Sequence, residues 1–208
     1  MKTLALEMST ARGSIAFRAD AAALFDCAFA ADRKHSGAFF ENVQLCLKRF
    51  GPPEQIVVGI GPGSYAGVRI AIATALGLRS STGAKLAGVP SICALDVEAS
   101  DYCVIGDARR QSFFSARIAS GRLIEGPILE SEPELQARLE HCAIPIFASE
   151  SLPQFSQVKP AYPSAARLAK MAGGLEGEIS DVELLEPIYL REPHITVPKP
   201  MGLIASRK

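Results

Sequence analysis

The sequence predicts an α/β protein of two lobes, each built from the same order of strands and helices. The first half of the 208-residue chain reads strand, strand, strand, helix, strand, helix, and the second half repeats that order. Hydrophobic residues make up 48% of the sequence, which is enough to bury a core in each lobe. A repeated supersecondary order indicates an architecture more firmly than any single element does. An unrelated pair of α+β modules is the alternative.

In the first half, three short apolar segments precede an amphipathic helix. Strands are expected at residues 4–8, 14–18 and 24–30. The helix begins after Ser36, which can cap it, and Gly51-Pro52-Pro53 ends it. A buried strand follows at 55–60, and after a glycine loop a second helix runs from Tyr65 to about Ser80.

The second half shows the same pattern with its own start and stop signals. Its strands are expected at residues 102–107, 112–119, 122–129 and 144–148. Ser131-Glu132-Pro133 opens a helix that reaches about Cys142, and a second helix at 163–172 ends at Gly173-Gly174.

This duplicated unit matches the actin, sugar-kinase and Hsp70 superfamily, whose two-lobed actin-like (ASKHA, RNase H-like) fold sets two such units face to face. We therefore expect an N-terminal lobe at 1–90 and a C-terminal lobe at 91–192. Residues 193–208 are expected to form a loose tail, because they contain three prolines and end in Ser-Arg-Lys.

Charge and cysteine content argue against several classes of protein. The 22 basic and 22 acidic residues balance, so a broad basic surface for nucleic acid is not indicated. No two cysteines form a C-x-x-C pair, which argues against a disulfide framework and a zinc knuckle. No apolar run is long enough for a membrane span or a signal-peptide core, so a cytoplasmic protein is expected. The cysteines are Cys27, Cys46, Cys93, Cys103 and Cys142.

The glycine loop Gly61-Pro62-Gly63-Ser64 lies between a strand and a helix N-terminus, which is a geometry that can bind an anion. Three specific enzyme motifs fit it poorly. A Walker loop fails because Val68-Arg69 follows Gly67 in place of Lys-Ser/Thr. A dinucleotide site lacks its ribose-binding acid, since no Asp or Glu lies between Glu54 and Asp96. A nucleophile elbow lacks its two glycines around the serine.

The helix after this loop carries small side chains on nearly every face. Small residues let another helix approach closely, and Gly77 costs about 1 kcal/mol of helix propensity unless packing requires it. The helix is therefore either buried inside the monomer or part of a subunit interface. Its small residues include Ala66, Gly67, Ala71, Ala73, Thr74, Ala75 and Gly77.

The segments LALEMSTARGSIA, RKHS and GIGPGSYAGVRIAIATALGL together resemble the TsaB (YeaZ) family. AGVPSICAL, IGDARR and EPIYLR continue the resemblance in the family's order. It implies a non-catalytic scaffold that partners a TsaD-like enzyme, with a TsaE-like ATPase, in placing a threonylcarbamoyl group on the tRNA adenosine next to the anticodon. Contact with tRNA would then be indirect.

The resemblance also implies that the first two helices form the subunit contact. The same surface would pair two copies of this chain when the partner is missing. The expected contact residues are Phe39, Phe40, Val43, Cys46, Leu47, Val68, Arg69, Ile72, Ala75 and Leu76.

The nucleotide cleft of the superfamily is expected to be vestigial. Glu7 stands where an aspartate is usual, and Asp107 is followed by Ala108-Arg109-Arg110-Gln111 in place of a glycine-rich turn. Asp107 is expected either to form a salt-bridged turn or to contact a partner or tRNA phosphate through the arginines. A vestigial anion site would comprise Glu7, Gly61, Gly63, Ser64 and Asp107, with no ATP or ADP expected.

No metal site is expected, because His35, His141 and His194 lie far apart in the sequence. Two alternatives remain. One is an ATP-dependent small-molecule kinase with Glu7 and Asp107 as its acids, and the other is a free-standing module that senses a nucleotide.

Overall fold

The computed structural model describes residues 1–31, 37–174 and 185–191, and it shows two five-stranded mixed sheets of the same topology. The first sheet has the order β3-β2-β1-β4-β5, and the second has the order β8-β7-β6-β9-β10. The first strand of each half pairs antiparallel with the second and parallel with the fourth. The duplicated α/β architecture is therefore confirmed. The strands are β1 (Lys2–Glu7), β2 (Arg12–Ala19), β3 (Ala22–Ala30), β4 (Gln55–Gly59), β5 (Lys85–Val89), β6 (Asp101–Asp107), β7 (Ser112–Ala119), β8 (Arg122–Ser131), β9 (Ile146–Ala148) and β10 (Lys159–Pro160).

The repeat differs from the prediction in its last elements. Helix α2 (Tyr65–Thr82) lies between β4 and β5, whereas the described segment 149–158 between β9 and β10 holds no helix. Helix α4 (Ala165–Met171) follows β10, so it is not the counterpart of α2. The sequence analysis missed β5 and β10 because one contains an internal glycine and the other has only two residues.

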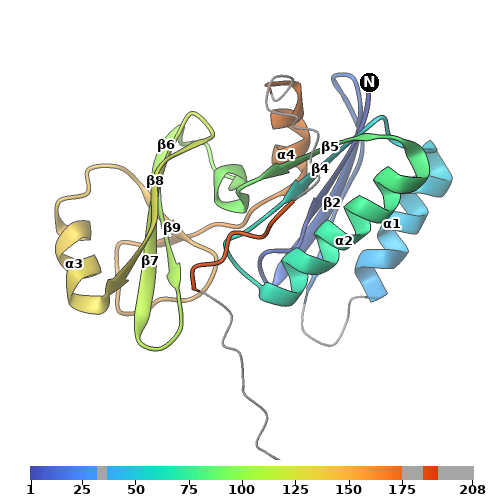
Figure 1. Cartoon of the computed structure of the whole chain (residues 1–208). Helices are drawn as coiled ribbons and strands as arrows, with labels where there is room; N and C mark the ends of the chain where they lie inside the picture. Colours follow the sequence, from blue (N-terminus) through green and yellow to red (C-terminus); the bar gives the residue numbers. More distant parts are fainter. Residues whose placement is uncertain (32–36, 175–184, 192–208) are drawn as a thin grey trace, which may run out of the picture.

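The first sheet is covered on both faces (Figure 1). Helix α1 (Gly37–Phe50) and α2 pack on the face that carries Leu4, Leu6 and their neighbours. The opposite face carries small residues such as Ala5 and Ala16, and α4 packs there on β1, β2 and β4. Period-two alternation along the strands separates these two cores.

Helix α4 thus belongs to the second half of the sequence but covers the sheet of the first half. Its first residue is held by a side chain from the other lobe, since Ala165 N donates to the buried Ser14 Oγ at 2.9 Å. The predicted lobe boundary at residues 90 and 91 separates the strands of the two sheets, although the second half contributes helices to both.

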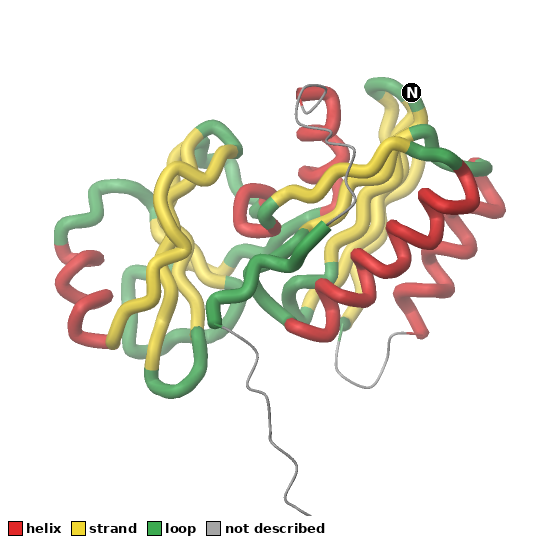
Figure 2. The backbone as a smooth tube through the Cα atoms, in the orientation of Figure 1, coloured by secondary structure: helices red, strands yellow, loops and turns green. Residues whose placement is uncertain are grey.

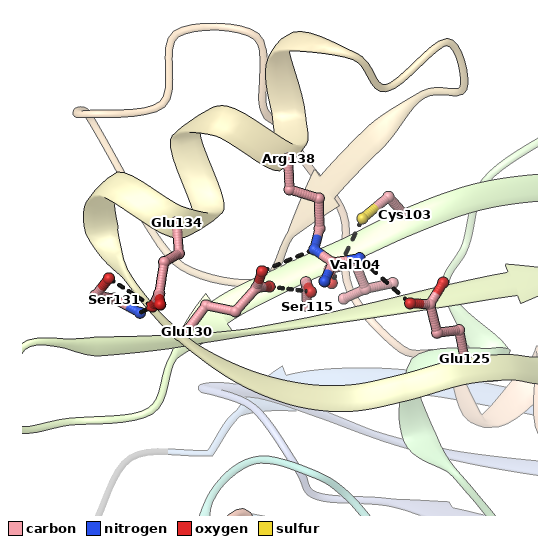
Figure 3. Close-up of polar contacts among 8 residues, drawn as sticks. All are labelled: Cys103, Val104, Ser115, Glu125, Glu130, Ser131, Glu134 and Arg138. Atoms are coloured by element: carbon pink, nitrogen blue, oxygen red, sulfur yellow. Dashed lines mark hydrogen bonds and ion pairs between the residues drawn. The ribbon is translucent and has the colours of Figure 1, made fainter.

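The second sheet carries α3 (Glu132–Glu140) on its outer face, where Leu135 and Leu139 are buried. The expected helix start is confirmed. Ser131 caps α3 in a capping box with Glu134, and Pro133 lies in the first turn. Arg138 reaches from α3 to the carboxylates of Glu130 and Glu125 at 2.7 and 3.2 Å (Figure 3).

The inner face of the second sheet shares one hydrophobic core with the first lobe. Val104 and Phe114 of the second sheet belong to the same cluster as Ala5 and Val57 of the first. The short 3-10 helix η1 (Ser91–Ala94) and α4 add further side chains to this cluster. Both helices lie between the two sheets in Figure 2. The two lobes therefore fold around common side chains.

The segment 185–191 crosses between the lobes, as its red trace shows in Figure 1. Ile188 N donates to Ile60 O at 2.8 Å, and Leu185 packs where a side chain at Gly88 would collide with it. The EPIYLR segment therefore packs back on the body of the protein.

Two sequence predictions fall outside the described residues: the Ser36 cap and the loose tail at 193–208. Among the described helices, none is long and apolar enough to cross a membrane.

Removing the Ser14 hydroxyl should weaken the junction between the lobes. We expect Ser14→Ala to lower the free energy of unfolding by about 1 kcal/mol, because Ala165 N would lose its acceptor in a buried position. Urea unfolding measures this change, with the exposed Ser80→Ala as the matched control. Equal losses in both variants would contradict this role of Ser14.

Candidate functional site

The glycine loop before α2 is filled by the chain's own backbone. Ser64 N donates to Ser9 O at 2.6 Å. A Cβ added at Gly63 would lie 2.1 Å from Ser9 O, and one added at Gly67 would lie 2.0 Å from Met8 O. Carbonyl oxygens of the turn after β1 therefore occupy the place that an anion would take at this helix N-terminus. The loop does not fit a phosphate.

Two further backbone amides of this region, those of Gly61 and Gly67, are also used internally. Gly61 N donates to Ser91 Oγ at 3.0 Å, and Ser64 Oγ accepts from Gly67 N at 3.2 Å as the N-cap of α2. Ile188 O lies 3.5 Å from a Cβ built on Gly61. The glycines thus serve close packing, with the turn after β1 on one side and the segment 185–191 on the other.

Two glycines of α2 make this packing role testable with the same substitution. At Gly67 an added methyl group meets backbone, so Gly67→Ala should lower the free energy of unfolding by about 1–3 kcal/mol. At Gly77 an added methyl group meets no described atom within 4 Å. Gly77→Ala should therefore raise the free energy of unfolding by up to about 1 kcal/mol. Denaturant unfolding of both variants checks the opposite signs. Equal effects would show that the turn after β1 does not constrain α2.

Glu7 lies at the carboxyl end of β1, and its side chain is completely buried. Its Oε1 accepts from Ser9 N at 2.6 Å, whereas Oε2 has no hydrogen-bond partner. Gly59 makes room for it, since an added Cβ would lie 1.9 Å from Oε2. Burial raises the pKa of Glu7, and the polar groups of Ser9, Ser91 and Met8 around the carboxylate oppose this shift only in part. The carboxyl group is enclosed, so it is not positioned to hold a metal ion or to attack a substrate.

The buried carboxyl group should make stability depend on pH. Because the pKa of Glu7 is raised in the folded state, the folded protein binds this proton more tightly than the unfolded chain. Its contribution is full below the ordinary pKa of 4.5 and is lost as the pH rises through the folded-state pKa. Glu7→Gln, which stays neutral, should therefore gain stability relative to the natural protein as the pH increases.

Thermal unfolding of Glu7→Gln and the natural protein between about pH 4.5 and pH 8 measures this difference. The exposed Glu98→Gln is the control for removing a surface carboxylate. Parallel Tm curves for Glu7→Gln and the natural protein would contradict the buried-acid explanation.

Asp107, at the carboxyl end of β6, forms a salt-bridged turn. Its carboxylate accepts from Arg109 N at 2.6 Å and from Arg109 Nη1 at 3.0 Å. Its own amide donates to Glu150 Oε1 at 2.6 Å. Arg109, Arg110 and Gln111 all have φ between 53° and 65°, a left-handed conformation that favours glycine. The turn therefore keeps a glycine-like path although it contains no glycine, and its side chains, including Gln111, are exposed.

Most of the predicted contact residues on α1 and α2 prove to be core residues. This corrects the sequence analysis, which took the apolar stripe of each helix as the contact surface. The stripe instead faces the first sheet, where strand side chains cover it. The buried residues are Phe39, Val43, Cys46, Val68, Ile72 and Ala75, all exposed by 6% or less. Leu47 is half-buried, and only Phe40, Arg69 and Leu76 of the ten are exposed.

The exposed sides of the two helices also carry apolar and small residues, although α1 exposes Glu41, Gln44, Lys48 and Arg49 beside them. We call this surface the outer helical face and define it by Phe40, Leu45, Tyr65, Ala66, Arg69, Ala73, Leu76 and Gly77. A Cβ at Gly77 meets no described atom within 4 Å, so the fold of the monomer does not require this glycine.

Sequence reasoning missed Tyr65 and Leu45, which lie outside the buried stripe. Their exposure could not be found from periodicity, because periodicity identifies only the side that is buried. Tyr65 could have been noticed as an aromatic residue directly after a helix cap.

The second lobe holds a pocket of about 300 Å³ between α3 and the edge of its sheet. Arg138, Glu125, His141 and Cys142 are among its lining residues, and Arg138 is already paired with two carboxylates (Figure 3). No buried unsatisfied polar group of the described residues lines this pocket. The pocket therefore gives no sign of a particular ligand.

The histidines do not gather in the described part of the chain. His141 is exposed directly after α3, and His35 and His194 lie outside the described residues. Among the described residues, no group of three His, Cys, Asp or Glu side chains could hold a metal ion.

Residues 30–127 match a family model described as TsaD, tRNA N6-adenosine threonylcarbamoyltransferase. An uncharacterized protein of Mycobacterium leprae (strain TN), ML0378, is 30% identical over 141 residues, which cover 67% of this chain and 38% of that protein. The uncharacterized protein Rv3421c of Mycobacterium tuberculosis (strain ATCC 25618 / H37Rv) is 28% identical over 147 residues, which cover 67% of this chain and 65% of that protein. The chain thus spans less than two thirds of these curated relatives.

Two solved structures share the fold over nearly their whole length. YeaZ from Pseudomonas aeruginosa superposes with a TM-score of 0.71 at 24% identity, covering 91% of this chain and 99% of that chain. A protein described as uncharacterized, with similarity to peptidase YEAZ from Pseudomonas aeruginosa, gives a TM-score of 0.74 at 23% identity with the same coverage. These likenesses establish the two-lobed α/β fold.

Proposed function

We propose that this chain is a partner subunit in tRNA threonylcarbamoylation. Its match to the TsaD family model and its YeaZ fold support its assignment to the TsaB (YeaZ) family. It acts as a non-catalytic scaffold for a TsaD-like enzyme, working with a TsaE-like ATPase in the cytoplasm. It uses no nucleotide of its own, and its contact with tRNA is indirect.

The observation that carries this proposal is the outer helical face. Phe40, Leu45 and Tyr65 are each about half exposed, on helices whose opposite sides are fully packed. Ala73 and Gly77 would let a partner backbone approach closely, and an exposed glycine in a helix is a cost of about 1 kcal/mol that the monomer does not explain. Exposed apolar patches of this kind mark interaction sites.

The surroundings of Glu7, Asp107 and the glycine loop support a scaffold rather than an enzyme. A kinase of this superfamily would need Glu7 and Asp107 open to Mg²⁺ and phosphate. Glu7 is enclosed beneath Gly59, and Asp107 is engaged by Arg109 in its own turn. The glycine loop, which a nucleotide-sensing module would use, is closed by Ser9 O.

The outer helical face also pairs two copies of this chain when the partner is absent. The same patch would meet itself around a two-fold axis, as in most soluble homodimers. A TsaD-like partner then competes with the second copy for the same residues.

A bulky charged residue at Gly77 should separate binding from folding. We expect Gly77→Arg to abolish association with the TsaD-like protein of the same organism and to make the chain monomeric when alone. The Tm should stay within a few degrees of the natural value, because no described atom lies near this position. Size-exclusion chromatography with light scattering measures both associations.

The control is Gly173→Arg, a substitution at an exposed glycine that also meets no described atom within 4 Å. It lies after α4, on the opposite side of the first sheet from the outer helical face. Unchanged association of Gly77→Arg, or an equal loss in Gly173→Arg, would overturn the proposed function.

A further inference from the structure

Two tyrosines and an arginine meet on the surface at the start of α2. The rings of Tyr65 and Tyr189 lie with centroids 5.5 Å apart and planes inclined by 34°. The Arg69 guanidinium lies 4.9 Å from the Tyr65 ring centroid, and Arg69 Nη1 donates to the Tyr65 hydroxyl. Tyr65 is 52% exposed and Tyr189 is 42% exposed, so both rings present a face to solvent.

The position of Tyr189 is fixed by the fold. The preceding residue donates its amide to Ile60 O, and Leu185 of the same segment packs into the core of the first lobe. Tyr65 is the first residue of α2, directly after the Ser64 cap. The rings are therefore ordered before any partner binds, which reduces the entropy that association has to overcome.

Arg69 has an unbalanced charge. Within the described parts of the chain it forms no ion pair, and its hydrogen bond and its cation–π contact are both with Tyr65. No acidic residue occurs in α2, whose charged residues are Arg69 and Arg79, and the last turn of α1 is basic with Lys48 and Arg49. A guanidinium has five N–H donors, so most of its donors stay available to a planar carboxylate.

We propose that Tyr65, Arg69 and Tyr189 form a preformed recognition site for a carboxylate side chain of the protein partner. The carboxylate pairs with the Arg69 guanidinium, and the two rings cover the pair from water. The neighbouring Ala73 and Gly77 admit the backbone of the helix that carries this carboxylate. The site rests on the proposed function and assigns to the segment 185–191 a part in binding the partner.

The alternative occupant is an RNA base, since exposed tyrosines beside an arginine can stack bases. The structure favours a protein. The two rings already contact each other at a tilt, and the small residues that continue along α2 suit a close helix and not a flexible phosphate backbone. Tyr and Arg are also the residues that most often dominate protein interfaces.

Calorimetric titration of the full chain with the TsaD-like protein of the same organism tests the site. Arg69→Gln should weaken the affinity about 30-fold and reduce its dependence on salt between about 0.05 and 0.3 M. Tyr189→Ser should weaken it about tenfold, while Tyr189→Phe, which keeps the ring, should bind within about twofold of the natural protein. The exposed Lys170→Gln on α4 is the control for losing one positive charge.

Four outcomes decide the matter. Losses in Arg69→Gln and Tyr189→Ser, with normal affinity for Tyr189→Phe and Lys170→Gln and unchanged Tm values, support the site. Normal affinity of Arg69→Gln and Tyr189→Ser, with loss in Gly77→Arg, would overturn the site and leave the proposed function standing. Normal protein association with weaker tRNA binding by the assembled complex would overturn it in favour of base stacking. An absence of association by the natural chain would overturn both.

Discussion

The direct contact between the turn after β1 and the first turn of α2 sets the arrangement of the first lobe. Ser64 N donates to Ser9 O, and the glycines at 63 and 67 bring two backbones to a distance that no side chain would allow. This contact uses the Ser64 amide at the helix start, and it holds the first turn of α2 against the turn after β1. A loop with the sequence features of a phosphate site therefore serves to pack α2 against the turn after β1. The outer side of α2 is left free as a consequence.

The two lobes are held together by elements that cross between them. Helix α4 follows the last strand of the second sheet but packs on the first, where small residues such as Ala5 and Ala16 let it approach. The segment 185–191 returns over the glycine loop and closes its other side. A shared core differs from the hinged arrangement that an enzyme closing on a nucleotide would need, because separating the lobes would expose apolar surface. The shared cluster therefore ties the two lobes together.

The enclosed Glu7 is packed inside the first lobe and not open to a ligand. Its carboxyl group lies at the end of β1, where an acid could serve chemistry, but Gly59 and Ser91 form a cradle around it. A buried carboxyl group with an unpaired oxygen costs stability when it is ionised, so the pKa rises and the group holds its proton more tightly. The second acid, Asp107 at the end of β6, is paired with Arg109 within its own turn. Both acids are thus occupied by the chain that carries them.

The sequence by itself determined the strand-strand-strand-helix-strand order that both halves share and the start of the helix at Ser131, because caps, periodicity and turn residues act over a few neighbouring positions. It also raised the correct doubt about the glycine loop. Only the tertiary structure decided which side of α1 and α2 is exposed: Phe39 is buried and Phe40 is open, although both are apolar and adjacent. An apolar stripe looks the same whether a sheet or another subunit covers it. The meeting of Tyr65 with Tyr189, and the cradle around Glu7, join residues far apart in the chain, and no local pattern encodes such contacts.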